Sequence, residues 1–177
     1  MPDTQLNSFR TATIAVLVDN EPGILARVVG LFSGRGYNID SLTVAAVEDG
    51  GNLSRINIVT SGTEMVIEQI KAQLDRLVPV HRVADLSKNG PYLAREMALI
   101  KVVCPHQGSG GSDRAEALRL ADAFRARVVD ATTESFVFEM TGSTDKLNAF
   151  INLMEPLGLV DVSRTGIVAI SRGSGKF

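Results

Sequence analysis

The chain has 177 residues, of which 45% are hydrophobic, so it can form one large domain or two small ones. Its formal net charge of −2 gives no electrostatic reason to expect nucleic acid or an anionic membrane as a partner. The single cysteine, Cys104, excludes an intrachain disulfide and fits a reducing cytoplasm. The sequence also lacks a secretory signal pattern and any apolar run near the ~20 residues that span a bilayer, so we expect a cytoplasmic protein without membrane segments.

The first two elements are predicted from an apolar run followed by helical spacing. Residues 13–18 are short, apolar and rich in β-branched side chains, as in a buried strand. Pro22 suits the first turn of the helix that follows, where its missing N–H costs nothing, and Gly34 and Gly36 are placed to end that helix. Between them, hydrophobic residues at helical spacing predict one broad apolar face: Ile24, Leu25, Val28, Val29, Leu31 and Phe32.

The next segments complete a β-α-β-β-α-β unit. Residues 39–47 alternate as in a strand, residues 48–52 form a glycine-containing hairpin loop, and residues 55–60 return as a strand. Residues 61–64 resemble a capping box, and residues 78–86 form the last strand. The helix between them carries one apolar face, made of Val66, Ile67, Ile70, Leu74 and Leu77. This order predicts a ferredoxin-like domain with both helices on one face of a four-stranded sheet.

The same order repeats after a polar break at residues 87–91. Asp113 is predicted to cap the first helix of this second repeat, after a glycine-rich loop at residues 105–112. The remaining predicted elements are strands at 96–104, 128–131, 135–141 and 159–170, the last with a bulge at 165–166, and a helix that presents Leu147, Phe150, Ile151 and Met154. The sequence therefore predicts an α+β protein of two tandem ferredoxin-like domains.

The turn before the first helix is a candidate site for an anion. A helix N-terminus carries free N–H groups and about half a positive charge, and Gly23 would let a ligand approach the backbone of residues 23–25. Asn20 and Asn38 flank this helix, and their amides can both donate and accept, which suits a ligand with ammonium and carboxylate groups. The same residue types are typical of turns, where Asn20 would be a turn or N-cap residue and Asn38 would take a left-handed conformation after a glycine. These residues alone leave both interpretations open.

Other kinds of chemistry lack the residues that they need. Cys104 and His106 would share a strand face, but no third group nearby orients them for nucleophilic catalysis, and no cluster has metal-ligand spacing. Residues 108–112 precede a helix without the lysine of a phosphate-binding P-loop, and residues 34–36 end a helix instead of opening a dinucleotide site. The phenylalanines of residues 135–138 are better explained as core than as an RNA-stacking platform.

The segment around the candidate turn carries a resemblance to a known family. Asp19–Val28 and Leu31–Val44 are similar to the regulatory small subunit of acetolactate synthase, also called acetohydroxyacid synthase, whose N-terminal part is an ACT domain. Leu53–Ile56, Asp85–Leu86 and Arg164–Gly173 fit the same family. The resemblance extends over nearly the whole chain, implies that the first repeat is an ACT domain, and favours the ligand-binding interpretation of the two asparagines.

The resemblance implies feedback inhibition by valine, and often by other branched-chain amino acids, of the pathway that makes them. The effector would lie between the paired ACT domains of a homodimer, with its carboxylate on the helix N-terminus and the asparagine amides on polar groups across the interface. The implied effector-binding residues are Asn20, Pro22, Gly23, Ile24, Leu25, Asn38 and Ile39. We expect no catalytic or metal-binding residue in this chain.

The resemblance also implies a catalytic partner. In this family the small subunit activates a catalytic large subunit that holds thiamine diphosphate, magnesium and FAD. This chain is therefore expected to bind none of these cofactors and to have no acetolactate synthase activity alone. One alternative is a stand-alone tandem ACT-domain amino-acid sensor that regulates another enzyme or transcription, and another is RNA binding through the two sheets.

The predicted domain boundaries follow the breaks between elements. A flexible N-terminus of residues 1–11 precedes the ACT domain at residues 12–86, which would bind the effector and dimerise. A linker at residues 87–94 leads to the C-terminal ferredoxin-like domain of the small-subunit family at residues 95–172, and residues 173–177 form a flexible tail.

Overall fold

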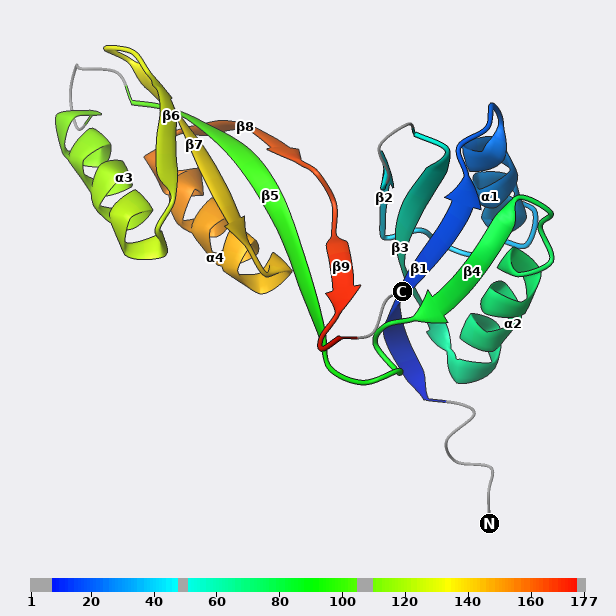
Figure 1. Cartoon of the computed structure of the whole chain (residues 1–177). Helices are drawn as coiled ribbons and strands as arrows, with labels where there is room; N and C mark the ends of the chain where they lie inside the picture. The colour runs from blue at the N-terminus through cyan, green and yellow to red at the C-terminus, as the bar shows by residue number, and fades with distance from the viewer. Residues whose placement is uncertain (1–7, 48–50, 105–109, 175–177) are drawn as a thin grey trace. The chain divides into compact units, whose positions relative to one another are not determined.

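The structure is a computed structural model that describes residues 8–47, 51–104 and 110–174 (Figure 1). The chain folds into two compact units. Unit 1 contains the residues up to Ala94 together with those from Ile167 onward, and unit 2 contains Arg95–Gly166. Over the described residues, no helix is both long enough and apolar enough to cross a membrane.

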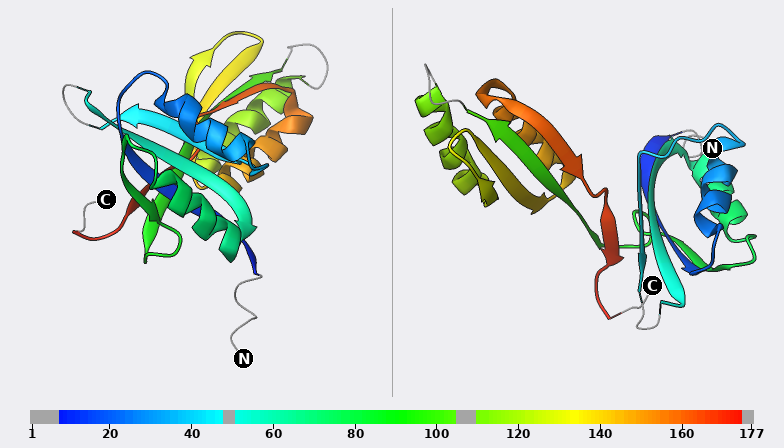
Figure 2. Two further views of the ribbon diagram at one scale, coloured as in Figure 1. Left: turned by 90° about the vertical axis from the view of Figure 1, so that its right-hand side faces the viewer. Right: turned by 90° about the horizontal axis from the view of Figure 1, so that it is seen from above.

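Unit 1 has the predicted ferredoxin-like arrangement. Its antiparallel sheet has the strand order β2-β3-β1-β4, and both helices cover one face of this sheet (Figure 1, Figure 2). The elements are β1 (Phe9–Asp19), α1 (Ile24–Ser33), β2 (Ser41–Ala46), β3 (Leu53–Thr63), α2 (Glu64–Leu74) and β4 (Val80–Asp85).

A single hydrophobic core lies between this sheet and its two helices. It is filled from alternate positions of β1 and β3 and from one face of each helix, as the periodicity of the sequence predicts. Its largest fully buried side chains are Ile14, Phe32, Ile56, Ile58, Ile67, Ile70 and Leu74. The apolar face of α1 is broader than the core needs, because Leu25 and Val29 remain 40% and 36% exposed.

The strand β1 begins earlier than the sequence suggests. The predicted flexible N-terminus covers residues 1–11, but β1 begins at Phe9 and pairs with β3 along its whole length, from Phe9 opposite Thr63 to Asp19 opposite Leu53. The first residues of this strand are mostly polar, so the apolar pattern of the sequence does not predict a strand there. Ionic contacts of Arg10 with two other elements fix it in place.

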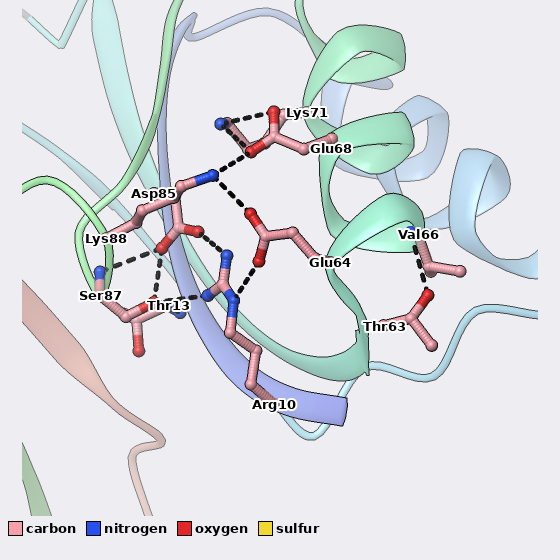
Figure 3. A network of polar contacts seen from close by, with 10 residues as sticks. All are labelled: Arg10, Thr13, Thr63, Glu64, Val66, Glu68, Lys71, Asp85, Ser87 and Lys88. Atoms are coloured by element: carbon pink, nitrogen blue, oxygen red, sulfur yellow. Dashed lines mark hydrogen bonds and ion pairs between the residues drawn. The ribbon is translucent and has the colours of Figure 1, made fainter. Parts of the chain in front are cut away.

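Figure 3 shows the network of polar side chains around Arg10. The guanidinium group of Arg10 contacts Glu64 at 2.6 Å and the fully buried carboxylate of Asp85 at 2.7 Å. The other oxygen of Asp85 accepts hydrogen bonds from the backbone N–H and the hydroxyl of Ser87, and Lys88 contacts Glu64 at 2.5 Å. The network therefore ties the start of β1 to the start of α2 and to the end of β4.

The start of α2 differs from the predicted capping box at residues 61–64. Thr63 is the N-cap residue, and its side-chain oxygen accepts a hydrogen bond from the backbone N–H of Val66. Glu64 is the first helical residue and bonds Arg10 and Lys88 instead of a cap N–H. The negative charge of Glu64 still lies in the first turn, where the helix dipole favours it.

Unit 2 repeats the topology with different residues. Its antiparallel sheet has the strand order β6-β7-β5-β8, and its buried core joins the sheet to both helices. The elements are β5 (Tyr92–Val103, which enters unit 2 at Arg95), α3 (Gly110–Phe124), β6 (Arg127–Ala131), β7 (Ser135–Gly142), α4 (Thr144–Met154), the 3₁₀ turn η1 (Glu155–Leu157) and β8 (Leu159–Arg164). Gly158 has a φ of 96°, and a Cβ there would lie 2.2 Å from the carbonyl oxygen of Val103, so only glycine fits.

Two predictions for the second repeat are corrected by the structure. The helix α3 begins at Gly110, so Asp113 lies within its first turn instead of capping it, and residues 105–109 of the predicted loop lie outside the described residues. The predicted last strand is two strands, because the chain passes from unit 2 to unit 1 after Gly166. The second of them, β9 (Val168–Ser171), belongs to unit 1, whereas the sequence boundary places the end of the C-terminal domain at residue 172.

The strand β9 covers the face of the unit 1 sheet that the helices leave free. Ala169 is buried there with Ala15 and Leu86. The carbonyl oxygen of Ala169 accepts a hydrogen bond of 2.7 Å from Arg55 on β3. On β2, the hydroxyl of Ser41 accepts a hydrogen bond of 2.9 Å from the backbone N–H of Ile167. Both faces of this sheet are therefore covered within unit 1.

We expect Arg10→Met to lower the free energy of unfolding of unit 1 by about 3 kcal/mol, because it leaves the buried carboxylate of Asp85 without its cation. Both tyrosines, Tyr37 and Tyr92, belong to unit 1 and the chain has no tryptophan, so urea unfolding followed by tyrosine fluorescence reports on this unit. The matched control is Arg27→Met, which removes an exposed ion pair with Glu21 and should cost about 0.5 kcal/mol or less.

The network also predicts acid sensitivity of unit 1. Hydrogen bonds from Arg10 and then from Lys88 lower the pKa of Glu64 from 4.5 to about 2. A carboxylate whose pKa is lowered on folding stabilises the protein fully above its unfolded pKa, and this contribution disappears as the pH falls from about 4.5 to about 2.

Glu64→Gln should therefore destabilise unit 1 at pH 7 and flatten the dependence of its unfolding free energy on pH across that window. The measurement is tyrosine-detected urea unfolding at several pH values. The same change in unit 2, Glu116→Gln, should leave the tyrosine-detected profile unaltered, and an unaltered profile for Glu64→Gln would contradict the assignment.

Candidate functional site

The N-terminus of α1 has no side-chain cap. Gly23 is its N-cap residue, with a φ of 86°, and the first turn of the helix contains no acidic residue. The first bond of the helical ladder runs from the N–H of Arg27 to the carbonyl oxygen of Gly23 at 3.0 Å, and the N–H of Ile24 bonds Glu21 only at 3.3 Å. Backbone donors at this end of the helix are thus available to an anion.

The space above this turn is open. A Cβ built on Gly23 would meet no atom within 4 Å, so none of the described side chains occupies that position. The positive φ is one that L side chains adopt at a cost, which explains the glycine. Pro22 precedes the N-cap residue, so it lies in the turn and not in the first turn of the helix as predicted.

Asn20 ties the turn before α1 to the residues that precede β3. Its side-chain Nδ2 donates to the carbonyl oxygen of Gly51 at 2.7 Å, and its backbone N–H donates to the carbonyl oxygen of Asn52 at 2.8 Å. Asn20 is therefore not the N-cap residue, which excludes the alternative that its side chain caps α1. Its amide is exposed and has its nitrogen oriented toward the β2–β3 connection.

Asn38 lies between α1 and β2, and its amide is also oriented. Its Nδ2 donates to Oδ1 of Asp40 at 2.5 Å, and its carbonyl oxygen accepts from the hydroxyl of Thr60 at 2.6 Å. Among the described residues other than glycine, Arg125 alone has a positive φ, so the alternative in which Asn38 takes a left-handed conformation is wrong. The positive φ of this connection belongs to Gly36.

Asp40 is a further polar residue at this end of the sheet, and its contact with Asn38 has a signal in the sequence. Two residues that are two apart on an extended segment point to the same side, so Asn38 and Asp40 can meet without any tertiary information. Asp40 also accepts a hydrogen bond of 2.8 Å from the hydroxyl of Ser61 on β3. The carboxylate therefore connects the predicted amide to the sheet.

One copy of the chain does not bring the two halves of the predicted site together. Asn20 and Gly23 follow the end of β1, where Asp19 lies opposite Leu53. Asn38 is bonded to Thr60, which lies opposite Ala12 near the other end of β1. The strand between these points is about 23 Å long at ~3.3 Å per residue, so the two asparagines lie at opposite ends of the sheet.

The apolar residues of the predicted set divide into two kinds. Ile24 is 5% exposed and packs in the core, and Ile39 packs against the same core. These two side chains therefore fix the position of the site, and only their backbone groups can contact a ligand. Leu25 points outward on α1, one turn before Val29. Leu25 is therefore the predicted apolar residue whose side chain can contact a ligand or a partner.

A hollow of about 550 Å³ lies elsewhere on the helical side of unit 1, and it shares no residue with the predicted set. It is lined by Arg35, Tyr37, Gln69, Ala72, Gln73 and Arg76. The predicted effector residues thus form a surface in a single copy and not a ready pocket.

The structure also bears on the residues considered for catalysis, RNA stacking and metal binding. Cys104 is buried, its thiol lies 3.2 Å from the carbonyl oxygen of Leu157, and burial raises its pKa, which disfavours the reactive thiolate. Its proposed neighbour His106 lies outside the described residues. Phe136 and Phe138 are buried in the core of unit 2, which confirms that they form no stacking platform. Over the described ranges, no group of three His, Cys, Asp or Glu side chains could hold a metal ion.

Comparisons with known proteins match both parts of the chain to one family. Residues 14–82 match a family model described as an AHAS small subunit-like ACT domain, and residues 95–173 match one described as the small subunit of acetolactate synthase. Two family models with consistent names thus cover both predicted domains.

Individual relatives match over almost their whole length. A probable acetolactate synthase small subunit of Archaeoglobus fulgidus is 45% identical over 93% of this chain and 98% of the relative. The acetolactate synthase isozyme 3 small subunit of Salmonella typhimurium is 44% identical over 90% of this chain and 94% of its own. The crystal structure of the small subunit of acetolactate synthase from Thermotoga maritima is 38% identical, with a TM-score of 0.83 over 94% of this chain and 99% of that chain. This chain belongs to the family of acetolactate synthase small subunits.

Proposed function

We propose that this chain is the regulatory subunit that makes acetolactate synthase sensitive to valine and that activates the catalytic subunit. The observation that carries the proposal is the uncapped N-terminus of α1, which is open to solvent above Gly23 and has no acidic residue in its first turn. Such a helix end attracts a carboxylate through its free N–H groups and its dipole.

The second half of the site would come from a second copy of the chain. The strand β2 lies at an edge of the sheet and runs in the same direction as β1, because both are antiparallel to β3. A two-fold axis that pairs β2 with its symmetry mate in antiparallel fashion brings the start of one β2 to the end of the other. Asn38 and Ile39 of one copy would then lie beside Asn20 and Gly23 of its partner, which supports a ligand shared by two copies.

Exposed apolar side chains support the same assembly. Leu25 is 40%, Val29 is 36% and Val44 is 42% exposed, and all three lie on α1 or on the edge strand β2. A second copy placed against β2 would cover part of this surface and leave room for a small aliphatic side chain next to the helix N-terminus. An amino acid of the valine type combines that side chain with the carboxylate that α1 would bind.

The catalytic partner would supply all of the chemistry. Thiamine diphosphate, magnesium and FAD belong to the large subunit in this proposal. The role of this chain is to change the stability of the active state of the large subunit. Valine inhibits if it binds the inactive arrangement more tightly than the active one, and such coupling energies are typically about 1–3 kcal/mol.

We expect Gly23→Asp to yield a subunit that still activates the catalytic partner but requires at least about tenfold more valine for inhibition, because the new carboxylate competes for the N–H groups of α1. The assay is acetolactate formation by the reconstituted holoenzyme at increasing valine concentration. Inhibition of this variant at the same valine concentration as the wild type would contradict the assignment of the site.

Two controls separate charge from strain. Gly23→Asn has nearly the same size and tolerates the left-handed conformation without the charge, so it should retain more sensitivity than Gly23→Asp. Gly30→Asp places the same charge on α1, away from its N-terminus and in open space, and should leave valine inhibition intact. The purified chain without its partner should form no acetolactate.

We also expect Val44→Lys to convert a two-chain species into single chains, because a lysine on an edge strand opposes strand pairing between copies. Light scattering would give the mass, and calorimetry on the same samples should show weaker valine binding. His81→Lys, on the opposite edge strand β4, is the matched control and should change neither quantity.

A further inference from the structure

Three hydrogen bonds hold Asp40, one through its backbone and two through its carboxylate. Its backbone N–H bonds the carbonyl oxygen of Val59 at 2.8 Å. Its Oδ2 accepts from the hydroxyl of Ser61 at 2.8 Å, and that hydroxyl lies 3.0 Å from the hydroxyl of Thr11. Its Oδ1 accepts from Nδ2 of Asn38 at 2.5 Å. Asp40 is thus a fixed acceptor between the sheet and the amide of Asn38.

A fixed acceptor determines which end of an amide faces outward. The Asn38 amide is planar, so holding Nδ2 against Asp40 directs Oδ1 away from it. Rotating this amide by half a turn would place its oxygen against a carboxylate oxygen, where two acceptors repel. The amide of Asn20 is oriented in the same sense, because its Nδ2 donates to the carbonyl oxygen of Gly51. Both asparagines therefore direct Oδ1 away from the partner of their Nδ2, and no hydrogen bond to either Oδ1 comes from the part of the chain that the structure describes.

We propose that Asp40 is a positioning residue that makes the effector site select a ligand with an ammonium group. This inference rests on the proposed function, in which the Asn38 region of one copy meets the α1 N-terminus of the other. The site then has hydrogen-bond donors at the helix N-terminus for a carboxylate and acceptors at Asn20 and Asn38 for an ammonium group. The nearby negative charge of Asp40 favours the same cation.

The chemical consequence is discrimination between an α-amino acid and its 2-oxo analogue. The 2-oxo acid keeps the carboxylate and the side chain, but a carbonyl oxygen replaces the ammonium group. That oxygen is an acceptor and would face the oriented Oδ1 of Asn38, so the analogue leaves acceptors unpaired. A site built to hydrogen-bond a substrate group rejects analogues that lack it far more strongly than a purely apolar pocket does.

The test is calorimetric titration of the full-length chain with valine and with 3-methyl-2-oxobutanoate. The wild-type chain should prefer valine by at least about 100-fold. Asp40→Leu, which frees the amide of Asn38, should reduce this preference to about tenfold or less. Asp40→Asn keeps an oxygen acceptor for Nδ2 of Asn38 without the charge, and should retain the preference to within about threefold.

The controls distinguish positioning from folding and charge. Asp75→Leu removes an exposed carboxylate at the end of α2 and should leave the preference unchanged. Ser61→Ala loosens Asp40 without touching Asn38, and it should lower the preference to a value between those of the wild type and Asp40→Leu. Activation of the catalytic subunit by each variant would verify its fold.

The failures can be told apart. If Asp40→Leu keeps the wild-type preference while binding valine, the positioning role is wrong and the proposed function stands. If Asp40→Asn loses the preference as completely as Asp40→Leu, charge and not orientation decides selection, and the inference is overturned. If the wild-type chain binds neither compound, both the proposed function and this inference are wrong.

Discussion

The positive φ of Gly23 is the constraint on which the candidate site depends. It lets the chain turn from the end of β1 into α1 without a side chain at the helix N-terminus, so no side-chain cap occupies the first turn of α1. A capping serine or aspartate at this position would satisfy those donors within the chain and remove the attraction for a ligand carboxylate. The helix is stable without a cap because Ile24, Val28 and Phe32 bury its other face.

The length of β1 then decides how the site can be completed. The strand β1 separates the donors near Gly23 from the acceptor at Asn38, which lie toward opposite ends of the same sheet. Twofold pairing of β2 would turn that separation into proximity, and it would build two equivalent sites at once. The polarity of each site would follow from the two local arrangements: free N–H groups in one copy and an oriented amide oxygen in the other. A single copy supplies each half in the right chemical form but in the wrong place.

Local patterns of the sequence were sufficient for most of the fold and for the location of the turn. The helical spacing of α1 and α4 and the glycine at residue 23 are short-range features, and the structure has them where expected. The start of β1 could not be predicted, because Arg10 is placed by Glu64 and Asp85, which lie far away in the chain. The hydrogen bond that orients Asn20 was equally hidden, since it depends on Gly51, which lies 31 residues further along the chain.

The division of the last predicted strand has a consequence for how this protein can be dissected. The chain leaves unit 1 after Ala94 and re-enters it at Ile167, and β5 and β9 pair with each other around this junction. A fragment that stops before unit 2 would lose Ala169 and bare the apolar patch formed by Ala15 and Leu86. The smallest self-sufficient form of unit 1 is therefore a splice, in which a short turn joins Ala94 directly to Ile167. Unit 2 is an insertion between the two chain segments that together form unit 1.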